Sequence, residues 1–154
     1  MTMQDPQTAA IEQPLATEVP GATLVGIIMG SDSDMELMRK AGDVLTDKGI
    51  AWEIEVMSAH RSPARVVEYC SGAHARGLKV LIAGAGLSAA LPGVAAAHTD
   101  LPVIGVPLSS ALSAAGGLDA ILSVVQMPPG VPVACVGLDN AKNAGHLAAR
   151  ILQS

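Results

Sequence analysis

The chain has 154 residues, enough for one domain with one hydrophobic core. Hydrophobic residues make up 50% of it and charged residues 15%, which excludes a disordered chain or a charged coiled coil and favours subunit contacts that cover apolar surface. With no Phe, one Trp, one Tyr and a formal net charge of -5, it lacks the aromatic and basic surface that nucleic acid requires.

Residues 1–20 hold three prolines and neither Lys nor Arg, and they follow neither a helical nor a strand period. We therefore expect a disordered N-terminal tail at residues 1–20, followed by a single catalytic domain at residues 21–154. The N-terminus has no basic segment followed by an apolar run, and later apolar runs are interrupted before the roughly 20 residues that span a membrane. These features predict a cytoplasmic protein with no membrane partner.

From residue 24 onward, short apolar runs alternate with longer helical patterns. Strands are predicted at residues 24–29, 52–57, 80–83, 102–106 and 131–136, and helices at residues 35–48, 63–76, 91–98, 117–126 and 140–152. Continuous apolar strands separated by helices indicate a parallel sheet that is covered on both faces. We predict an α/β fold, a three-layer α/β/α sandwich with a parallel, flavodoxin-like central sheet, and ligands bind such sheets at the carboxyl ends of the strands.

The loop after the first predicted strand reads Gly-Ser-Asp-Ser-Asp at residues 30–34 and opens a helix. Backbone N–H groups at a helix N-terminus, together with the hydroxyls of Ser31 and Ser33, suit a phosphate group. Carboxylates would oppose a phosphate, so at least one of Asp32 and Asp34 is expected to accept hydrogen bonds from ribose hydroxyls. The same residue types are also preferred N-caps, so simple helix capping is the alternative.

The loop after the second predicted strand reads Ser-Ala-His-Arg-Ser-Pro at residues 58–63. Ser62 is a natural N-cap and Pro63 a natural first helical residue, which leaves His60 and Arg61 on the loop. A histidine can exchange a proton near neutral pH, and an arginine can hold a phosphate with its planar guanidinium. The alternative is a polar turn that faces solvent.

Residues 84–86, Gly-Ala-Gly, place little side-chain bulk where the third predicted strand ends. A ligand or another backbone segment can therefore approach closely there, although small residues also serve helix packing. His74, His98 and His146 are interpreted as structural or surface residues, and Cys70 and Cys135 as inert buried thiols in apolar stretches. No pair of potential ligands has the spacing of a metal site, so no metal is predicted.

With these loops identified, residues 24–152 resemble the class I N5-carboxyaminoimidazole ribonucleotide mutases, the PurE family. The resemblance rests on several ordered motifs: Met-Gly-Ser-x-Ser-Asp at residues 29–34, Ser-Ala-His-Arg at 58–61, Ala-Gly-Ala-Gly at 83–86, Leu-Pro-Gly at 91–93, Pro-Val-Ile-Gly-Val-Pro at 102–107 and Val-Gln-Met-Pro at 125–128.

The resemblance implies an isomerase of purine biosynthesis that moves a carboxylate from N5 to C4 of aminoimidazole ribonucleotide, without a cofactor or a metal. It implies that His60 is the catalytic residue that handles protons and that Arg61 holds the phosphate. The implied substrate-binding residues are Ser31, Ser33, Asp34, Ser58, Arg61, Gly84, Ala85, Gly86 and Leu91. The family is typically a homo-octamer with active sites at subunit interfaces, so the same assembly is expected here.

The chain departs from the family pattern in its third loop, where Leu87, Ser88 and Ala90 stand in place of Gly, Ala and His, and this alters the carboxylate pocket. It also ends at Ser154, without the C-terminal segment that many relatives use to contact neighbouring subunits. Two other functions stay open. One is an aminoimidazole ribonucleotide carboxylase that uses free carbon dioxide, and the other is a non-catalytic, flavodoxin-like nucleotide-binding module.

Overall fold

The computed structural model describes residues 14–16 and 19–154 of the chain. Within them, one sheet of six strands has the order β1-β3-β2-β4-β5-β6. The strands are β1 (Leu15–Ala16), β2 (Val25–Met29), β3 (Trp52–Val56), β4 (Val80–Gly86), β5 (Val103–Leu108) and β6 (Ala134–Cys135). Only β1 runs antiparallel, against β3, and the other five strands are parallel.

The order of the parallel strands, β3-β2-β4-β5-β6, is the doubly wound order of flavodoxin-like sheets. The chain crosses from β2 outward to β3 and then returns to β4 on the other side of β2. The crevice outside the carboxyl ends of β2 and β4 is therefore the topological switch point, where ligands bind in this class of sheet. The predicted fold class is confirmed.

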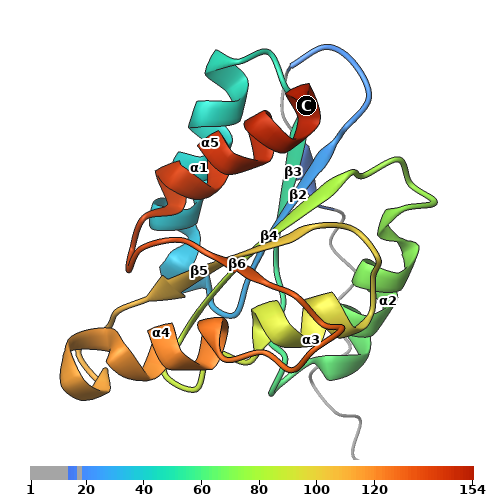
Figure 1. The fold of residues 1–154 in the computed structure, drawn as a ribbon. Coiled ribbons are helices and arrows are strands. Elements are labelled where there is room, and N and C mark those ends of the chain that lie inside the picture. Colours follow the sequence, from blue (N-terminus) through green and yellow to red (C-terminus); the bar gives the residue numbers. More distant parts are fainter. Residues whose placement is uncertain (1–13, 17–18) are drawn as a thin grey trace, which may run out of the picture.

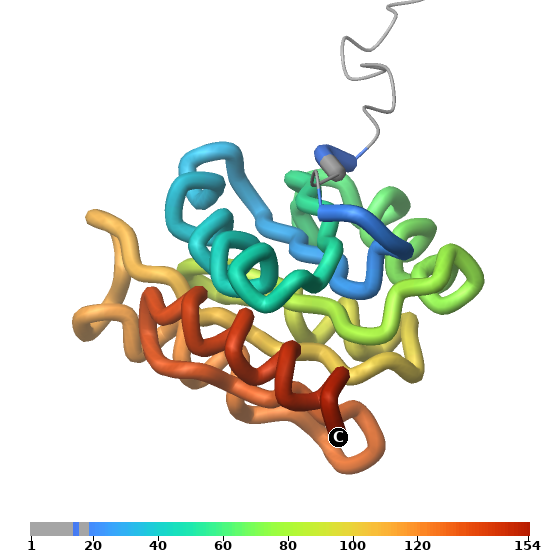
Figure 2. Tube along the Cα trace, turned by 90° about the horizontal axis from the view of Figure 1, so that it is seen from above, coloured from blue at the N-terminus to red at the C-terminus, as the bar shows by residue number. Residues whose placement is uncertain are grey.

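Helices cover both faces of the sheet, which gives three layers (Figure 1). On one face lie α1 (Met35–Asp47) and α5 (Ala141–Gln153), and on the other lie α2 (Pro63–Ala73), α3 (Leu91–Ala97) and α4 (Leu118–Val125). Two short 3-10 helices, η1 (Asp32–Asp34) and η2 (Ala114–Gly117), precede α1 and α4. Figure 2 shows α1 and α5 side by side along the same face.

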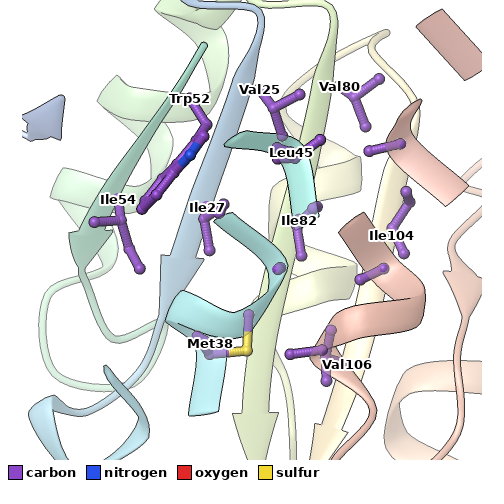
Figure 3. Close-up of a cluster of buried hydrophobic side chains, with 14 of the residues drawn as sticks. Val25, Ile27, Met38, Leu45, Trp52, Ile54, Val80, Ile82, Ile104 and Val106 are labelled. Carbon is purple, nitrogen blue, oxygen red and sulfur yellow. The ribbon is translucent and has the colours of Figure 1, made fainter. Parts of the chain in front are cut away.

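Successive residues of the central strands enter two separate cores, because side chains alternate across a strand. Ile27 packs under α1 and α5, whereas its neighbour Ile28 packs under α2 and α3, and both are fully buried. Figure 3 shows the first core, in which Met38 of α1 lies over Ile82 and Val106 of the sheet. Burying each such side chain contributes about 1.5–3 kcal/mol, so these aliphatic strands explain why the sheet needs few aromatic residues.

Close contact between α1 and α5 depends on Gly145. A Cβ atom at this position would lie 2.6 Å from the carbonyl oxygen of Ala41 and 3.0 Å from Cβ of Val44. The two helix axes can approach this closely only because Gly145 has no side chain. Because each of these helices follows a parallel strand, the N-termini of α1 and α5 both lie at the carboxyl edge of the sheet.

The structure differs from the sequence prediction in three strands. Most of the tail predicted at residues 1–20 lies outside the described residues, but Leu15 and Ala16 form a strand that the pattern did not predict, because two residues show no period. Strand β4 continues to Gly86, three residues beyond the predicted end. The predicted strand at residues 131–136 pairs only at Ala134–Cys135, and Pro132 within it has no N–H to donate.

Cys70 is fully buried in the second core, and burial raises the pKa of its thiol to about 11. Burial also raises the pKa of the half-buried Cys135. Both thiols are free and stay protonated near neutral pH. Burial was predicted for both, and it is found for Cys70 but not for Cys135. Among the described residues, no helix is long and apolar enough to cross a membrane.

Candidate active site

The loop after β2 is held together by its own serines. Ser31 is the N-cap of η1, where its Oγ accepts a hydrogen bond from the N–H of Ser33 at 3.4 Å and lies 3.0 Å from the Ser33 hydroxyl. The capping function considered from the sequence is thus present. Capping occupies one lone pair of the Ser31 hydroxyl. The Ser33 hydroxyl is exposed at the carboxyl edge of the sheet, so it can still contact a ligand.

The loop after β3 is a turn tied by two hydroxyls. The Oγ of Ser58 accepts hydrogen bonds from the backbone N–H groups of His60 at 3.3 Å and Arg61 at 3.1 Å. Ser62 does not cap α2 through its side chain, and its Oγ instead accepts a hydrogen bond from the N–H of Ser58 at 3.0 Å. Pro63 begins the helix as predicted. These bonds fix the backbone of a turn whose His60 and Arg61 side chains are exposed.

Arg61 joins the two loops at the switch point. Its Nη2 donates a hydrogen bond to the carbonyl oxygen of Gly30 at 2.7 Å, and its positive charge also acts on Asp34. Burial raises the pKa of Asp34 above its usual value, and the negative charge of Asp139 adds to this effect. A hydrogen bond from the Ser31 backbone and the charge of Arg61 oppose it. Arg61 and Asp34 therefore place a cation and a partly buried carboxyl group at one edge of the sheet.

The small residues at the end of β4 are used for packing. A Cβ atom on Gly84 would lie 2.4 Å from the Sδ of Met38, and one on Gly86 would lie 2.9 Å from the carbonyl oxygen of Leu108. For Gly86 the close neighbour is the backbone of β5. The sequence predicted the close approach of either a ligand or another backbone segment at this position. Residues 84–86 were predicted to follow the third strand, and this prediction was wrong because they are the last residues of β4.

Two further predicted binding residues have buried side chains. Ala85 is 8% exposed and Leu91 is 2% exposed, and both belong to the second core. Only the backbone groups of these two residues can therefore contact a ligand. The loop proper begins at Leu87, whose side chain is 42% exposed and whose φ of 55° lies in the left-handed region. A leucine is strained in this conformation, since its Cβ crowds the following carbonyl.

Asp139, at the same edge, was not predicted as a site residue, whereas its partner Ser109 lies in residues 107–113, which the sequence places among the loops at the carboxyl ends of the strands. The backbone N–H of Ser109, just after β5, donates to Oδ1 of Asp139 at 2.8 Å, and the Ser109 hydroxyl donates to Oδ2 of the same carboxylate. Asp139 lies between β6 and α5, in the loop after the last parallel strand. Its position at a carboxyl strand end was the signal that the sequence offered for it.

A pocket of about 840 Å³ opens at the opposite, amino-terminal edge of the sheet, and its lining includes His98, Pro102, Val131 and Ile151. None of the predicted site residues lines it, so it is separate from the candidate site. His74, His98 and His146 are exposed. In the part of the chain that the structure describes, no three His, Cys, Asp or Glu residues are grouped closely enough to hold a metal ion.

The fold and the site define a doubly wound α/β protein whose switch point carries a histidine, an arginine and a serine-rich helix N-terminus. Residues 24–154 match the family model described as AIR carboxylase, and the chain belongs to this family.

Curated relatives cover most of the chain. It is 57% identical over 129 residues to an N5-carboxyaminoimidazole ribonucleotide mutase of Pyrococcus horikoshii, covering 84% of this chain and 72% of that protein. It is 57% identical over 128 residues to a mutase of the same name from Thermotoga maritima, covering 83% and 74%. A phosphoribosylaminoimidazole carboxylase of Saccharomyces cerevisiae is 50% identical over 147 residues, which span 96% of this chain but 25% of that protein.

Among solved structures, the crystal structure of Treponema denticola PurE superimposes with a TM-score of 0.74 at 36% sequence identity, covering 85% of this chain and 80% of that chain. The similarity therefore extends over most of the chain, and it is not limited to the motif loops.

Proposed function

We propose that this protein is an N5-carboxyaminoimidazole ribonucleotide mutase, an isomerase of purine biosynthesis that moves the carboxylate of its substrate from N5 to C4. The mutases of Pyrococcus horikoshii and Thermotoga maritima, each 57% identical to this chain, support this assignment. A cytoplasmic location follows from the same pathway assignment.

One contact carries the proposal. The hydrogen bond of 2.7 Å from Arg61 to the Gly30 carbonyl brings the Ser-Ala-His-Arg loop against the Gly-Ser-Asp-Ser-Asp loop. A substrate phosphate at the N-terminus of η1 and α1 would then meet the Arg61 guanidinium, the Ser31 and Ser33 hydroxyls and backbone N–H groups. The Asp34 carboxyl group would accept hydrogen bonds from the ribose hydroxyls.

His60 is the proton carrier in the proposed reaction. A protonated His60 donates to N5 as the bond between N5 and the carboxyl carbon breaks, which yields carbon dioxide and the neutral amine. Ring carbon C4 then attacks the carbon dioxide, and neutral His60 removes the C4 proton. The proton lost at C4 replaces the one given to N5, so the reaction is an isomerisation that needs no ATP or metal.

Confinement of the carbon dioxide requires a closed site, and in a single chain His60 and Arg61 are exposed. A homo-octamer with active sites at subunit interfaces would supply the missing walls. An apolar stripe on α4 supports self-association, because Leu118, Leu122 and Val125 are each 47–49% exposed at helical spacing. Leu112, in the loop before α4, is 80% exposed.

A carboxylase that uses free carbon dioxide is the second candidate, favoured by the 50% identity to the yeast phosphoribosylaminoimidazole carboxylase. A direct assay separates the two functions. The purified protein is given freshly prepared N5-carboxyaminoimidazole ribonucleotide, with and without added bicarbonate, and formation of the C4-carboxylated product is followed by absorbance. A mutase has the same initial rate in both mixtures, whereas a carboxylase forms product only in the mixture with added bicarbonate, from aminoimidazole ribonucleotide that the substrate releases on hydrolysis.

A further inference from the structure

The carboxylate of Asp139 fastens two loops of the candidate site to each other. Its Oδ1 accepts a hydrogen bond from the Ser109 N–H at 2.8 Å, and its Oδ2 accepts one from the Ser109 hydroxyl. The backbone N–H of Asp139 also donates to the Pro107 carbonyl at 2.9 Å. These bonds join the end of β5 to the start of α5, across 30 residues of sequence. Both partners lie at the carboxyl edge, where ligands bind in such sheets.

The backbone conformation at Asp139 supports a dedicated role. Its φ of 57° lies in the left-handed region, which residues other than glycine rarely adopt and in which Asp and Asn are enriched. Surrounding contacts must hold such a residue in place, and strain of this kind is concentrated at functional sites. In this conformation the Asp139 carboxylate reaches Ser109 and the Asp139 N–H reaches Pro107.

Helix packing fixes Asp139 relative to Asp34. Asp34 precedes α1 directly, and Asn140, the residue after Asp139, caps α5 by accepting a hydrogen bond from the Asn143 N–H at 3.1 Å. Because α1 and α5 each follow a parallel strand and pack against each other, their N-termini and the two carboxylates lie at one edge of the sheet. Among the described residues, the charged groups that act on the pKa of Asp34 are Arg61, which lowers it, and Asp139, which raises it.

We propose that Asp139 is a positioning residue of the active site, which holds Ser109 and the loop after β5 across the carboxyl edge from Asp34. The role rests on the proposed function. Asp139 acts through Ser109 and does not itself need to touch the substrate. A loop that is not fastened must be ordered at each binding event, so loss of Asp139 raises KM and leaves kcat nearly unchanged.

Two variants separate the role of the Asp139 carboxylate from the role of its backbone conformation. Asp139→Gly removes the carboxylate and keeps the left-handed conformation free of strain, whereas Asp139→Asn keeps an oxygen acceptor for the Ser109 N–H. Loss of a hydrogen bond to a charged acceptor predicts an increase in KM of about 10-fold or more for Asp139→Gly, with kcat within about threefold. Asp139→Asn is expected to restore KM to within about threefold of the parent value.

The matched control is Asp119→Ala. Asp119 fastens the far end of the same loop, since its Oδ2 accepts a hydrogen bond from the Ala114 N–H at 3.1 Å, but it is not among the groups that act on Asp34. KM for this control is expected to stay within about twofold of the parent, because the bond lies at the start of α4 and away from Ser109. Equal increases for Asp119→Ala and Asp139→Gly would indicate general loop destabilisation and overturn the proposal.

Two measurements without substrate complete the test. Amide hydrogen exchange at Ser109 should be faster in Asp139→Gly than in the parent, and carboxyl NMR should show a lower pKa for Asp34 in Asp139→Asn, because a like charge is removed. Unchanged exchange at Ser109 would overturn the fastening. Faster exchange with an unchanged KM would overturn the positioning role alone. A parent protein without mutase turnover would overturn the proposed function, and the positioning role with it.

Discussion

Replacing Arg61 with alanine tests how the candidate site holds its phosphate. The Arg61 guanidinium is exposed, yet it is oriented by its hydrogen bond of 2.7 Å to the Gly30 carbonyl and faces the partly buried Asp34. A charge-assisted hydrogen bond contributes about 1.5–3 kcal/mol, and exposure to solvent places Arg61 near the lower end of this range. At about 1.5–2 kcal/mol, Arg61→Ala should weaken binding of aminoimidazole ribonucleotide about 10- to 30-fold.

The assay is isothermal titration calorimetry with aminoimidazole ribonucleotide and with the nucleoside that lacks its phosphate. Removing the phosphate should cost the parent protein much more affinity than it costs Arg61→Ala, because the variant has already lost one phosphate contact. Arg39→Ala is the matched control. Arg39 lies over the Trp52 ring at 6.0 Å, near the amino end of β3, so its loss should not alter the response to the phosphate.

Equal losses of affinity in the parent and in Arg61→Ala would refute the assignment, because they would show that Arg61 makes no contact with the phosphate. If Arg61→Ala had a much lower melting temperature than Arg39→Ala, Arg61 would have a structural role instead. The hydrogen bond to Gly30 is exposed, so its loss should reduce the free energy of unfolding by less than about 1 kcal/mol.

Three further outcomes are expected. His60→Asn should bind nucleotide and keep its melting temperature while losing about 100-fold or more in kcat, because Asn cannot exchange a proton near pH 7. Leu87→Gly should be more stable than Ser88→Gly by about 1 kcal/mol in urea unfolding, because only residue 87 has a positive φ that glycine relieves. Gly145→Ala should lower the free energy of unfolding by about 1–3 kcal/mol, since its Cβ would meet an α1 carbonyl at 2.6 Å. Gly72→Ala, whose nearest neighbour would be 3.6 Å away, should not lower it.

The parallel sheet could be predicted from the sequence because its signals are local. The run that contains Ile27 and Ile28 is apolar on both faces, and Pro63 marks the start of α2. The end of β4 could not be predicted this way. Gly84 and Gly86 have low strand propensity, and their place in the strand depends on Met38 and on β5, which local sequence does not reveal.

The sequence predicted which polar loops lie at the carboxyl edge of the sheet, but it did not predict the contacts between them. His60 and Arg61 stood out because nothing in the local pattern accounts for them. The contact from Arg61 to Gly30 spans 31 residues and the contact from Ser109 to Asp139 spans 30, so neither has a periodic signature. Both contacts exist because parallel strands bring their carboxyl ends to one edge, a consequence of topology that follows only once the strand order is known.

An isotope-transfer experiment tests the central claim most directly. N5-carboxyaminoimidazole ribonucleotide labelled with carbon-13 in its carboxyl group is turned over in unlabelled bicarbonate, and the product is analysed by NMR. A mutase that confines carbon dioxide delivers the label to the C4 carboxylate, and His60→Asn delivers almost none. A C4 carboxylate that carries the unlabelled carbon of bicarbonate, or formation of product only from aminoimidazole ribonucleotide and bicarbonate, would contradict the assignment of this protein as a mutase.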